Sequence, residues 1–257
     1  MLYIDSKENN TFRKIKKYRT KKYRDKDKKF LAEGTKFLDF IKIPEYILVN
    51  ENDKENEEIL NRIEKFIGKC EIIILSSILF SQLTTQENSQ GVILVYSYNE
   101  NSIETIGNNI VVLDRIGDPG NLGTIIRTMD AAGFRDIVLI KGSVDAYNDK
   151  AIRSTMGSIF NVNLYYIAED ELLELLKVKS YKIISTVLHE DSILYTEMQL
   201  SEKNAIVFGN EGSGVSSNFI ENSDEKVIIP IYGTAESLNV AMACGIIMYK
   251  VREKIEL

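Results

Sequence analysis

The sequence predicts an α/β protein built from two domains. Short apolar runs typical of buried strands alternate with amphipathic helical patterns along most of the 257 residues. The polar stretch NENSIETIGNN, at 99–109, interrupts this alternation, which then starts again. We therefore expect a small N-terminal α/β domain at 1–105 and a larger, doubly wound α/β domain at 106–257.

The elements of the first domain follow from runs of apolar residues and from their spacing. The segment FLAEGTKFLDFI, at 30–41, indicates a strand that enters a helix. The runs YILVN, EIIIL and GVILVYSY predict strands at 46–50, 71–75 and 91–98. Between the first two of these strands, ENEEILNRIEKFI predicts an amphipathic helix.

The second domain continues the same alternation. Strands are expected at 110–114, 136–140, 162–167, 181–188, 204–209 and 226–231. Helices are expected at about 121–133, 148–158 and 169–178, after 215, and from Leu238 to Glu253. Strands separated by helices of this length are typical of a largely parallel sheet.

The scarce residues restrict the chemistry. His189 is the single histidine, so a mechanism that needs two imidazoles is excluded. Cys70 and Cys244 are too far apart in sequence for a zinc-type pair, and we expect reduced thiols and no metal site. The N-terminus lacks an apolar signal core, and no apolar run is long enough to span a membrane. We therefore expect a cytoplasmic protein without membrane contact.

Charge is distributed very unevenly along the chain. The formal net charge of −6 taken alone argues against a nucleic-acid partner, but residues 13–29 carry +9, which leaves −15 for the remainder. The bases of this segment are Arg13, Lys14, Lys16, Lys17, Arg19, Lys21, Lys22, Arg24, Lys26, Lys28 and Lys29. The aromatic residues Phe12, Tyr18, Tyr23 and Phe30 are interleaved with them. A solvated helix is the simpler interpretation, but aromatic rings that stack on bases beside cations that meet phosphates favour RNA contact.

The first of three polar, glycine-rich segments follows the strand expected at 110–114. In LDRIGDPGNLGTIIRTMDAAGF, three glycines and Pro119 form a tight loop before a helix. Asn121 and Arg127 are six positions apart, which places them on one side of that helix. A loop of this kind is common, and alone it is weak evidence of function.

The second segment, IVFGNEGSGVS, follows the strand expected at 204–209. Glu211 stands among Gly209, Gly212 and Gly214, where backbone can approach a ligand closely. The glycine spacing differs from the dinucleotide-binding fingerprint. Taken alone, the segment is a glycine-rich turn with an incidental acid.

The third segment, VIIPIYGTAESLNVAMACGIIMY, runs from a strand through a short loop into an apolar helix. Ser237 and Asn239 lie just before that helix, and Ser237 alone would be interpreted as its N-cap. All three segments follow predicted strands, at the edge where open α/β sheets bind their ligands.

Jointly, NLGTIIRT, FGNEGSG and IPIYGTAESLNVAMA resemble the motifs of the SpoU (TrmH) family of RNA ribose 2'-O-methyltransferases, within the SPOUT superfamily. The resemblance covers 108–257. The segment YRDKDKKFLAEGTKFL, at 23–38, is similar to the RNA-binding domain that family members often carry. The resemblance implies a C-terminal α/β domain with a deep trefoil knot, S-adenosylmethionine as cofactor, an RNA substrate and a homodimer. Ribosomal RNA is favoured over transfer RNA.

The resemblance also implies which residues form the site. By the resemblance, the catalytic residues are Asn121, Arg127, Glu211, Ser237 and Asn239. The residues expected to bind the cofactor are Thr186, Gly209, Ile229, Ile231 and Leu238. Arginine holds its proton tightly and its fork suits phosphate, so Arg127 is either a general base or a phosphate clamp. The neutral groups can orient it, and Glu211 can fix the motif loops or contact the cofactor region. No metal is required.

Three alternatives stay open on sequence grounds. The chain can be a non-catalytic RNA-binding or ribosome-assembly factor that retains the fold, or a transfer RNA ribose methyltransferase. Base-directed methylation is disfavoured because the NEGSG and ESLN motifs match the ribose branch.

Overall fold

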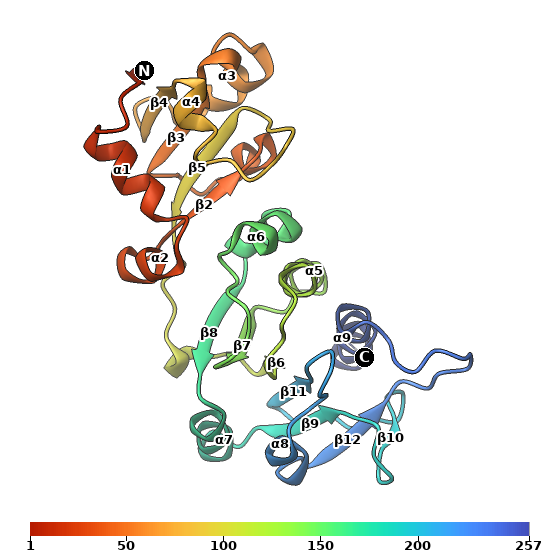
Figure 1. Ribbon diagram of the computed structural model, residues 1–257. Coiled ribbons are helices and arrows are strands. Elements are labelled where there is room, and N and C mark those ends of the chain that lie inside the picture. The colour runs from red at the N-terminus through yellow and green to blue at the C-terminus, as the bar shows by residue number, and fades with distance from the viewer. Residues whose placement is uncertain (257) are drawn as a thin grey trace. The chain divides into compact units, whose positions relative to one another are not determined.

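The computed structural model describes residues 1–256, and the chain forms two compact units (Figure 1). One unit contains Met1–Tyr98 together with Asp145–Phe160. The other contains Asn99–Val144 and the chain from Asn161 onward. Both units are built from strands and helices, so the predicted α/β class is confirmed.

The N-terminal unit is organised around a five-stranded mixed sheet in the order β1-β4-β3-β5-β2. Its strands are β1 (Leu2–Ile4), β2 (Lys29–Glu33), β3 (Tyr46–Asn50), β4 (Glu71–Leu75) and β5 (Val92–Ser97). Strands β1, β4 and β3 run parallel, whereas β5 is antiparallel to β3 and to β2. Its helices are α1 (Asn10–Lys17), α2 (Lys21–Asp27), α3 (Glu57–Ile63), α4 (Ser77–Phe80) and α6 (Asp149–Thr155). The sequence did not predict β1 or α4, and the helix expected within 30–41 is only a 3-10 turn, η1 (Thr35–Asp39).

The basic segment forms α1 and α2. The side-chain oxygen of Asn9 caps α1 by accepting hydrogen bonds from the backbone N–H groups of Thr11 and Phe12, at 2.9 and 3.1 Å. Phe12 and Ile15, three positions apart on one face of the helix, are buried in the core of the unit. The lysines of α1 are exposed. The segment is therefore an amphipathic element that helps to build the core, and only its charged face is available to a partner.

Three of the four aromatic residues interleaved with the bases are buried in the core and are not exposed to RNA. Phe12, Tyr18 and Phe30 are at most 2% exposed, so the prediction that they stack on RNA bases is wrong. Their positions in α1, its C-cap and β2 turn them toward the core. Tyr23 alone of the four keeps partial exposure.

Residues 145–160 pack within the N-terminal unit, although they follow a strand of the other unit (Figure 1). The Tyr147 ring stacks on Tyr98 at a centroid distance of 3.7 Å and lies 4.9 Å from Phe30. The Arg24 Nη2 atom lies 2.5 Å from Asp145 Oδ2, and both side chains are largely buried. This part of the chain therefore completes the aromatic core beside β2 and β5.

The second unit contains a seven-stranded, fully parallel sheet in the order β10-β12-β9-β11-β6-β7-β8. Its strands are β6 (Asn109–Leu113), β7 (Asp136–Ile140), β8 (Asn163–Ile167), β9 (Lys182–Thr186), β10 (Ile193–Leu194), β11 (Asn204–Phe208) and β12 (Glu225–Ile228). Every residue of β7 and β11 is buried, as expected for central strands covered on both faces. The short edge strand β10 was not predicted.

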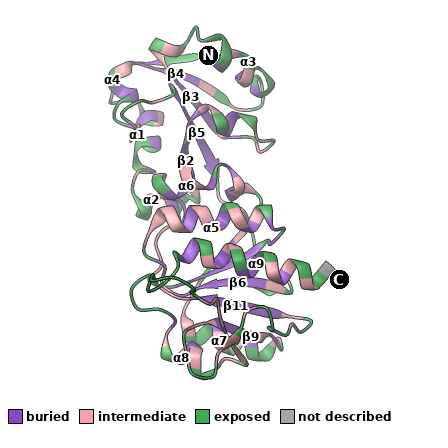
Figure 2. Cartoon of the chain, turned by 90° about the vertical axis from the view of Figure 1, so that its right-hand side faces the viewer, coloured by how far each residue is buried: buried purple, intermediate pink, exposed green. Residues whose placement is uncertain are grey.

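Four helices cover this sheet: α5 (Pro119–Ala131), α7 (Glu169–Val178), α8 (Ser217–Glu221) and α9 (Val240–Glu256). Helices α5 and α9 lie together on one face, and α7 and α8 lie on the other (Figures 1 and 2). The two helices pack together at Gly245, where a Cβ atom would lie 3.5 Å from Thr128 Cγ2, an ordinary van der Waals distance. The doubly wound arrangement is confirmed, and the knot stays a prediction.

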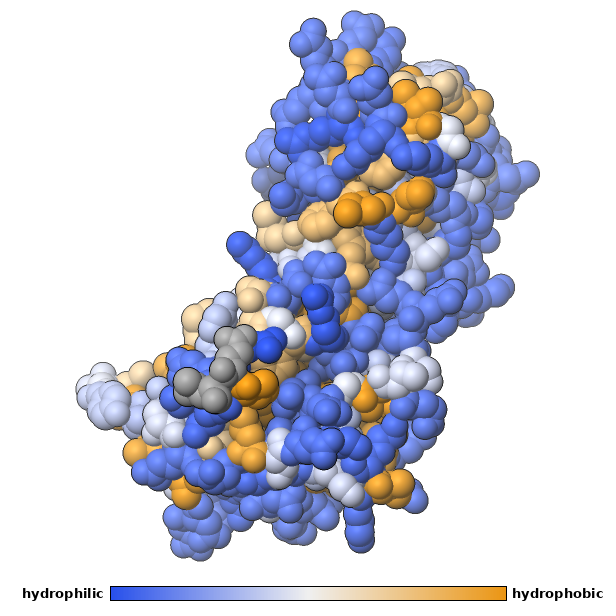
Figure 3. Space-filling view, turned by 180° about the vertical axis from the view of Figure 1, so that it is seen from behind, coloured by the Kyte–Doolittle hydropathy of each residue, from blue (hydrophilic) through white to orange (hydrophobic). Residues whose placement is uncertain are grey.

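The surface seen in Figure 3 is mostly hydrophilic, with apolar side chains in separate patches. Within residues 1–256, no helix has the length and apolar character needed to cross a membrane.

Candidate active site

The candidate site lies at the carboxyl edge of the parallel sheet. Strands β12, β9, β11 and β6 are consecutive neighbours, so the loops that follow them meet at this edge. The three segments identified in the sequence follow β6, β11 and β12.

Asn121 lies at the centre of a chain of hydrogen bonds that joins the three motifs. Asp118 caps α5 by accepting a hydrogen bond from the Asn121 backbone N–H at 2.8 Å, which fixes Asn121 in the first turn. The Asn121 Nδ2 group donates to Glu211 Oε1 at 2.9 Å. Its Oδ1 atom accepts from Asn239 Nδ2 at 2.9 Å. Side chains 90 and 118 positions away from Asn121 are thereby held at one point.

Glu211 fixes the loop after β6, which is one of the two roles expected for it from the sequence. Its carboxylate also accepts hydrogen bonds from the backbone N–H groups of Gly117 and Asp118, at 3.1 and 3.3 Å. Burial raises the pKa of Glu211, but the hydrogen bonds from Asn121 and from backbone N–H groups outweigh it, and the pKa is lowered overall. The carboxylate is therefore held ionised.

This lowered pKa makes the contribution of Glu211 to stability depend on pH. Because its pKa is lower in the folded than in the unfolded state, the stabilisation is present above the unfolded pKa and is lost as pH falls through the folded pKa. We expect Glu211→Gln to reduce the free energy of unfolding by only about 1 kcal/mol at neutral pH, because the residue is exposed and partly screened. Urea unfolding over a pH series measures this difference, with exposed Glu202→Gln as control. A difference that persists at acid pH would contradict the assignment.

Asn210 is a site residue that the sequence analysis missed. Its Oδ1 atom accepts hydrogen bonds from the N–H groups of Gly212 and Ser213 at 2.9 and 3.1 Å, and its Nδ2 group donates to the Arg115 carbonyl oxygen at 2.7 Å. Asparagine before a glycine-rich turn is a recognisable signal for such local bonding. Its contact with Arg115, 95 positions away, has no such signal.

A second polar cluster beneath the motif loops was also missed. The buried carboxylate of Asp114 accepts a hydrogen bond from the Ser216 N–H at 2.7 Å and lies 2.7 Å from Arg115 Nη2. Glu169 accepts from Arg115 Nη1 at 2.8 Å and from Ser216 Oγ at 2.6 Å. Burial lowers the pKa of Arg115, but the two carboxylates outweigh it and raise the pKa overall. This cluster joins the end of β6 to the loop after β11.

Gly209 is placed where no other residue fits. A Cβ atom at this position would lie 2.2 Å from the carbonyl carbon of Gly214 and from the backbone nitrogen of Val215. Because both are backbone atoms, neither can move aside cheaply. The close approach explains this glycine without reference to a cofactor.

We expect Gly209→Ala to reduce the free energy of unfolding by about 3 kcal/mol, because the added methyl group forces the two backbone segments apart. Gly233→Ala is the matched control, since a Cβ atom there meets nothing within 4 Å. Chemical unfolding of both variants measures the difference. Equal stability of the two variants would show that the loop yields without cost.

Asn239, rather than Ser237, caps α9. Its Oδ1 atom accepts a hydrogen bond from the Ala241 N–H at 2.9 Å, and its carbonyl oxygen accepts from the Ala243 N–H at 3.0 Å. The interpretation of Ser237 as the N-cap is therefore wrong, because the helix begins at Val240. Ser237 is exposed and makes no hydrogen bond to the residues that the structure describes.

Arg127 stands apart from the hydrogen-bonded group. It lies on α5 six residues beyond Asn121, is exposed, and forms no hydrogen bond or ion pair with any residue in 1–256. The expectation that Asn121, Ser237 and Asn239 orient it is thus not met by direct contacts. An exposed guanidinium without a partner among the described residues is available to a phosphate.

The residues expected to bind the cofactor all follow or end strands at this edge. Thr186, at the end of β9, donates a hydrogen bond from Oγ1 to the Val207 carbonyl oxygen at 2.9 Å. Ile229 is partly buried, whereas Ile231 and Leu238 are 40% and 41% exposed. Partly exposed apolar side chains are the kind of group that packs against the adenosine portion of S-adenosylmethionine, and their role as its binding site stays a prediction.

Polar groups and apolar side chains that converge at the carboxyl edge of a parallel sheet define an α/β enzyme with its ligand at the strand ends. Residues 108–249 match the SpoU rRNA Methylase family, and residues 9–94 match the MRM3-like substrate binding domain. The chain therefore belongs to the SpoU rRNA methylase family.

The similarity to individual relatives extends over most or nearly all of the chain. The chain is 35% identical over 256 residues to the 23S rRNA (guanosine(2553)-2'-O)-methyltransferase RlmP of Bacillus subtilis (strain 168), covering 98% of this chain and 100% of that protein. It is 29% identical to the 23S rRNA (guanosine-2'-O-)-methyltransferase RlmB of Blochmanniella floridana, covering 81% and 86%. The crystal structure of an AdoMet-bound rRNA methyltransferase from Sinorhizobium meliloti superposes with a TM-score of 0.83 at 27% identity and covers 98% of each chain.

Proposed function

We propose that the chain transfers the methyl group of S-adenosylmethionine to a ribose 2'-hydroxyl of ribosomal RNA. The observation that carries this proposal is the bonding of Asn121 to both Glu211 and Asn239, because it unites three separate motifs at one sheet edge. The relatives support the reaction and the cofactor: RlmP is named for 2'-O-methylation of 23S rRNA, and the Sinorhizobium meliloti structure is described as AdoMet-bound.

The two parts of the chain have different tasks in this proposal. Residues 1–105 bind the substrate RNA and residues 106–257 perform methyl transfer, which the two family matches support. The proposed reaction requires no metal, and among the described residues no group of three or more His, Cys, Asp or Glu is placed to hold one. The location proposed is the cytoplasm.

The residues of the site have distinct roles in the proposed reaction. A ribose hydroxyl is a weak nucleophile near neutral pH, so transfer gains from alignment of its oxygen and removal of its proton. When bound, S-adenosylmethionine supplies an electrophilic methyl group. Arg127 binds the phosphate next to the target ribose or, in its neutral guanidine form, accepts the hydroxyl proton. Glu211, Asn121 and Asn239 hold the motif loops in place.

Cells with and without the protein test the assignment of the RNA. Ribosomal and transfer RNA are isolated from both, and ribose methylation is mapped in each. We expect one 2'-O-methylated position in ribosomal RNA to be lost. A loss confined to transfer RNA would contradict the proposed substrate, and unchanged methylation of both would favour a non-catalytic assembly factor.

We also propose that the chain functions as a homodimer through α9. Met242, Ile246 and Tyr249 are 38–54% exposed and recur every three or four residues, which forms an apolar stripe along the helix. A second copy of the chain would cover this stripe. Sedimentation of the full chain measures the mass, and a monomer at micromolar concentration would contradict the proposal.

A further inference from the structure

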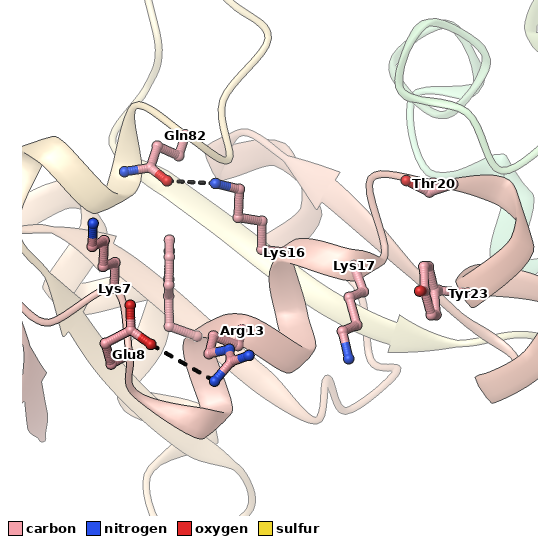
Figure 4. Close-up of a pocket in the computed structure, with 9 residues that line it drawn as sticks. Lys7, Glu8, Arg13, Lys16, Lys17, Thr20, Tyr23 and Gln82 are labelled. Carbon is pink, nitrogen blue, oxygen red and sulfur yellow. Dashed lines mark hydrogen bonds and ion pairs between the residues drawn. The ribbon is translucent and has the colours of Figure 1, made fainter.

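A cavity lies along α1 in the N-terminal unit, outside the candidate active site (Figure 4). Its volume is about 410 Å³, and it is wide open to solvent rather than enclosed. Its lining comes from the loop before α1, from α1, from the start of α2 and from Gln82.

The charged side chains at this cavity are mostly cationic. Lys7, Arg13, Lys16 and Lys17 line it together with a single carboxylate, Glu8. The Arg13 Nη1 atom lies 3.7 Å from Glu8 Oε2, and both side chains are more than half exposed, so their pairing is weak. The cavity therefore has an excess of positive charge and fits an anionic ligand.

Among residues 1–256, two of these lysines have only neutral contacts. Lys16 Nζ donates to Gln82 Oε1 at 2.5 Å, and Lys17 Nζ lies 5.5 Å from the centre of the Tyr23 ring. By contrast, several other bases of the segment pair with acids inside the unit. These pairs are Lys14 and Lys29 with Glu45, Arg19 with Asp149, and Arg24 with Asp145. The structure thus divides the basic segment into bases that stabilise the unit and bases that are left for a partner.

Tyr23 supplies the aromatic component. It is partly buried and packs against the core, which fixes the position of its ring, and it lines the cavity next to Lys17 (Figure 4). The Thr20 hydroxyl and the Gln82 amide add neutral hydrogen-bonding groups. Cations that meet phosphates beside a ring that stacks on a base are the components of single-stranded nucleic-acid sites.

We propose that this cavity holds one unpaired nucleotide of the substrate RNA, with its base against Tyr23 and its flanking phosphates on Arg13, Lys16 and Lys17. The inference rests on the proposed function for the nature of the substrate. A base inside a duplex has both faces covered by its neighbours and cannot reach the ring. The site therefore selects RNA with an unpaired position.

The test uses the full chain and short single-stranded RNA that carries the fluorescent base 2-aminopurine, with the corresponding duplex for comparison. We expect tighter binding of the single strand and a change of fluorescence on binding. Tyr23→Leu should weaken binding by about tenfold, and Tyr23→Phe should not. Lys16→Gln with Lys17→Gln should reduce the slope of log K against log salt by about 1.4.

Lys22→Gln with Lys26→Gln is the matched control, because it removes the same charge from exposed positions of the same segment outside the cavity. We expect this control to keep the fluorescence change and to lose less affinity. Equal losses in both double variants, or unaltered binding by Tyr23→Leu, would overturn the proposal. If the cavity variants keep wild-type affinity and full methyl transfer, the nucleotide site is refuted and the proposed methyltransferase function stands. If the unmodified chain binds RNA at this cavity but transfers no methyl group, the proposed methyltransferase function is refuted and the nucleotide site stands.

Discussion

Replacement of Arg127 by alanine is expected to reduce methyl transfer to RNA by about 10²- to 10⁴-fold, with little change in cofactor affinity. Arg127 lies on α5, six residues beyond Asn121, with an exposed guanidinium that has no partner among residues 1–256. Such a group is free to bind a phosphate or, after loss of its own proton, to accept the ribose proton, and both roles act on the RNA. Single-turnover kinetics with labelled cofactor measures the loss, and calorimetry measures cofactor binding.

Arg127→Lys separates the two roles. If the guanidinium clamps a phosphate, lysine keeps the charge and restores part of the RNA affinity, while the pH profile stays unchanged. If it is the base, the pH profile shifts, because an ammonium group loses its proton more readily. Arg135→Ala is the control, since Arg135 is exposed in the same unit and already contacts the Asn161 carbonyl oxygen. Full activity of Arg127→Ala would refute the role of this residue.

Replacement of Arg24 by alanine is expected to reduce the free energy of unfolding of the N-terminal unit by about 3–5 kcal/mol. The Arg24 side chain is only 6% exposed, donates to the Tyr18 carbonyl oxygen at 2.9 Å and pairs with Asp145. Removal of one partner leaves the other charge buried without compensation. Arg13→Ala, in which an exposed side chain is removed, should cost less than about 1 kcal/mol.

A double replacement distinguishes charge from packing. Arg24→Met combined with Asp145→Leu leaves no buried charge, so we expect it to be more stable than either single replacement. Urea unfolding monitored by tyrosine fluorescence measures all the variants. Single replacements that cost no more than Arg13→Ala would show that the buried pair contributes little.

The order of strands and helices was predictable because the central strands are buried on both faces. The runs DIVLI and NAIVF are wholly buried in β7 and β11, so their hydrophobicity directly reflects their environment. The edge strands β1 and β10 were missed, since they have three and two residues and are partly exposed. Short edge strands carry too little apolar signal to be recognised.

The basic segment shows the limit of reading charge and aromatic residues together. The sequence placed Phe12 and Tyr18 among cations, but helical geometry turns both toward the core. Likewise, the partner of Arg24 lies 121 positions away in a segment that the sequence assigned to the other domain. Neutralising every base of this segment would therefore damage the fold as well as RNA binding.

The candidate site was predictable in its motifs and not in its contacts. Asn121, Glu211 and Asn239 were identified, and the structure joins them through hydrogen bonds. Ser216 ends the second motif segment and Glu169 lies outside all three, and their contact was missed because it arises only when α7 and the loop after β11 are brought together. Pairings between distant positions depend on the tertiary fold, which a single sequence does not contain.

The central claim is that this chain methylates the ribose of RNA. The most direct measurement incubates the purified chain with methyl-labelled S-adenosylmethionine and ribosomal RNA, digests the RNA to nucleosides and locates the label by mass spectrometry. We expect label on the ribose 2'-oxygen of one nucleoside, and at least about 10²-fold slower labelling with Arg127→Ala. Label on a base, or no label although the cofactor is bound, would contradict it.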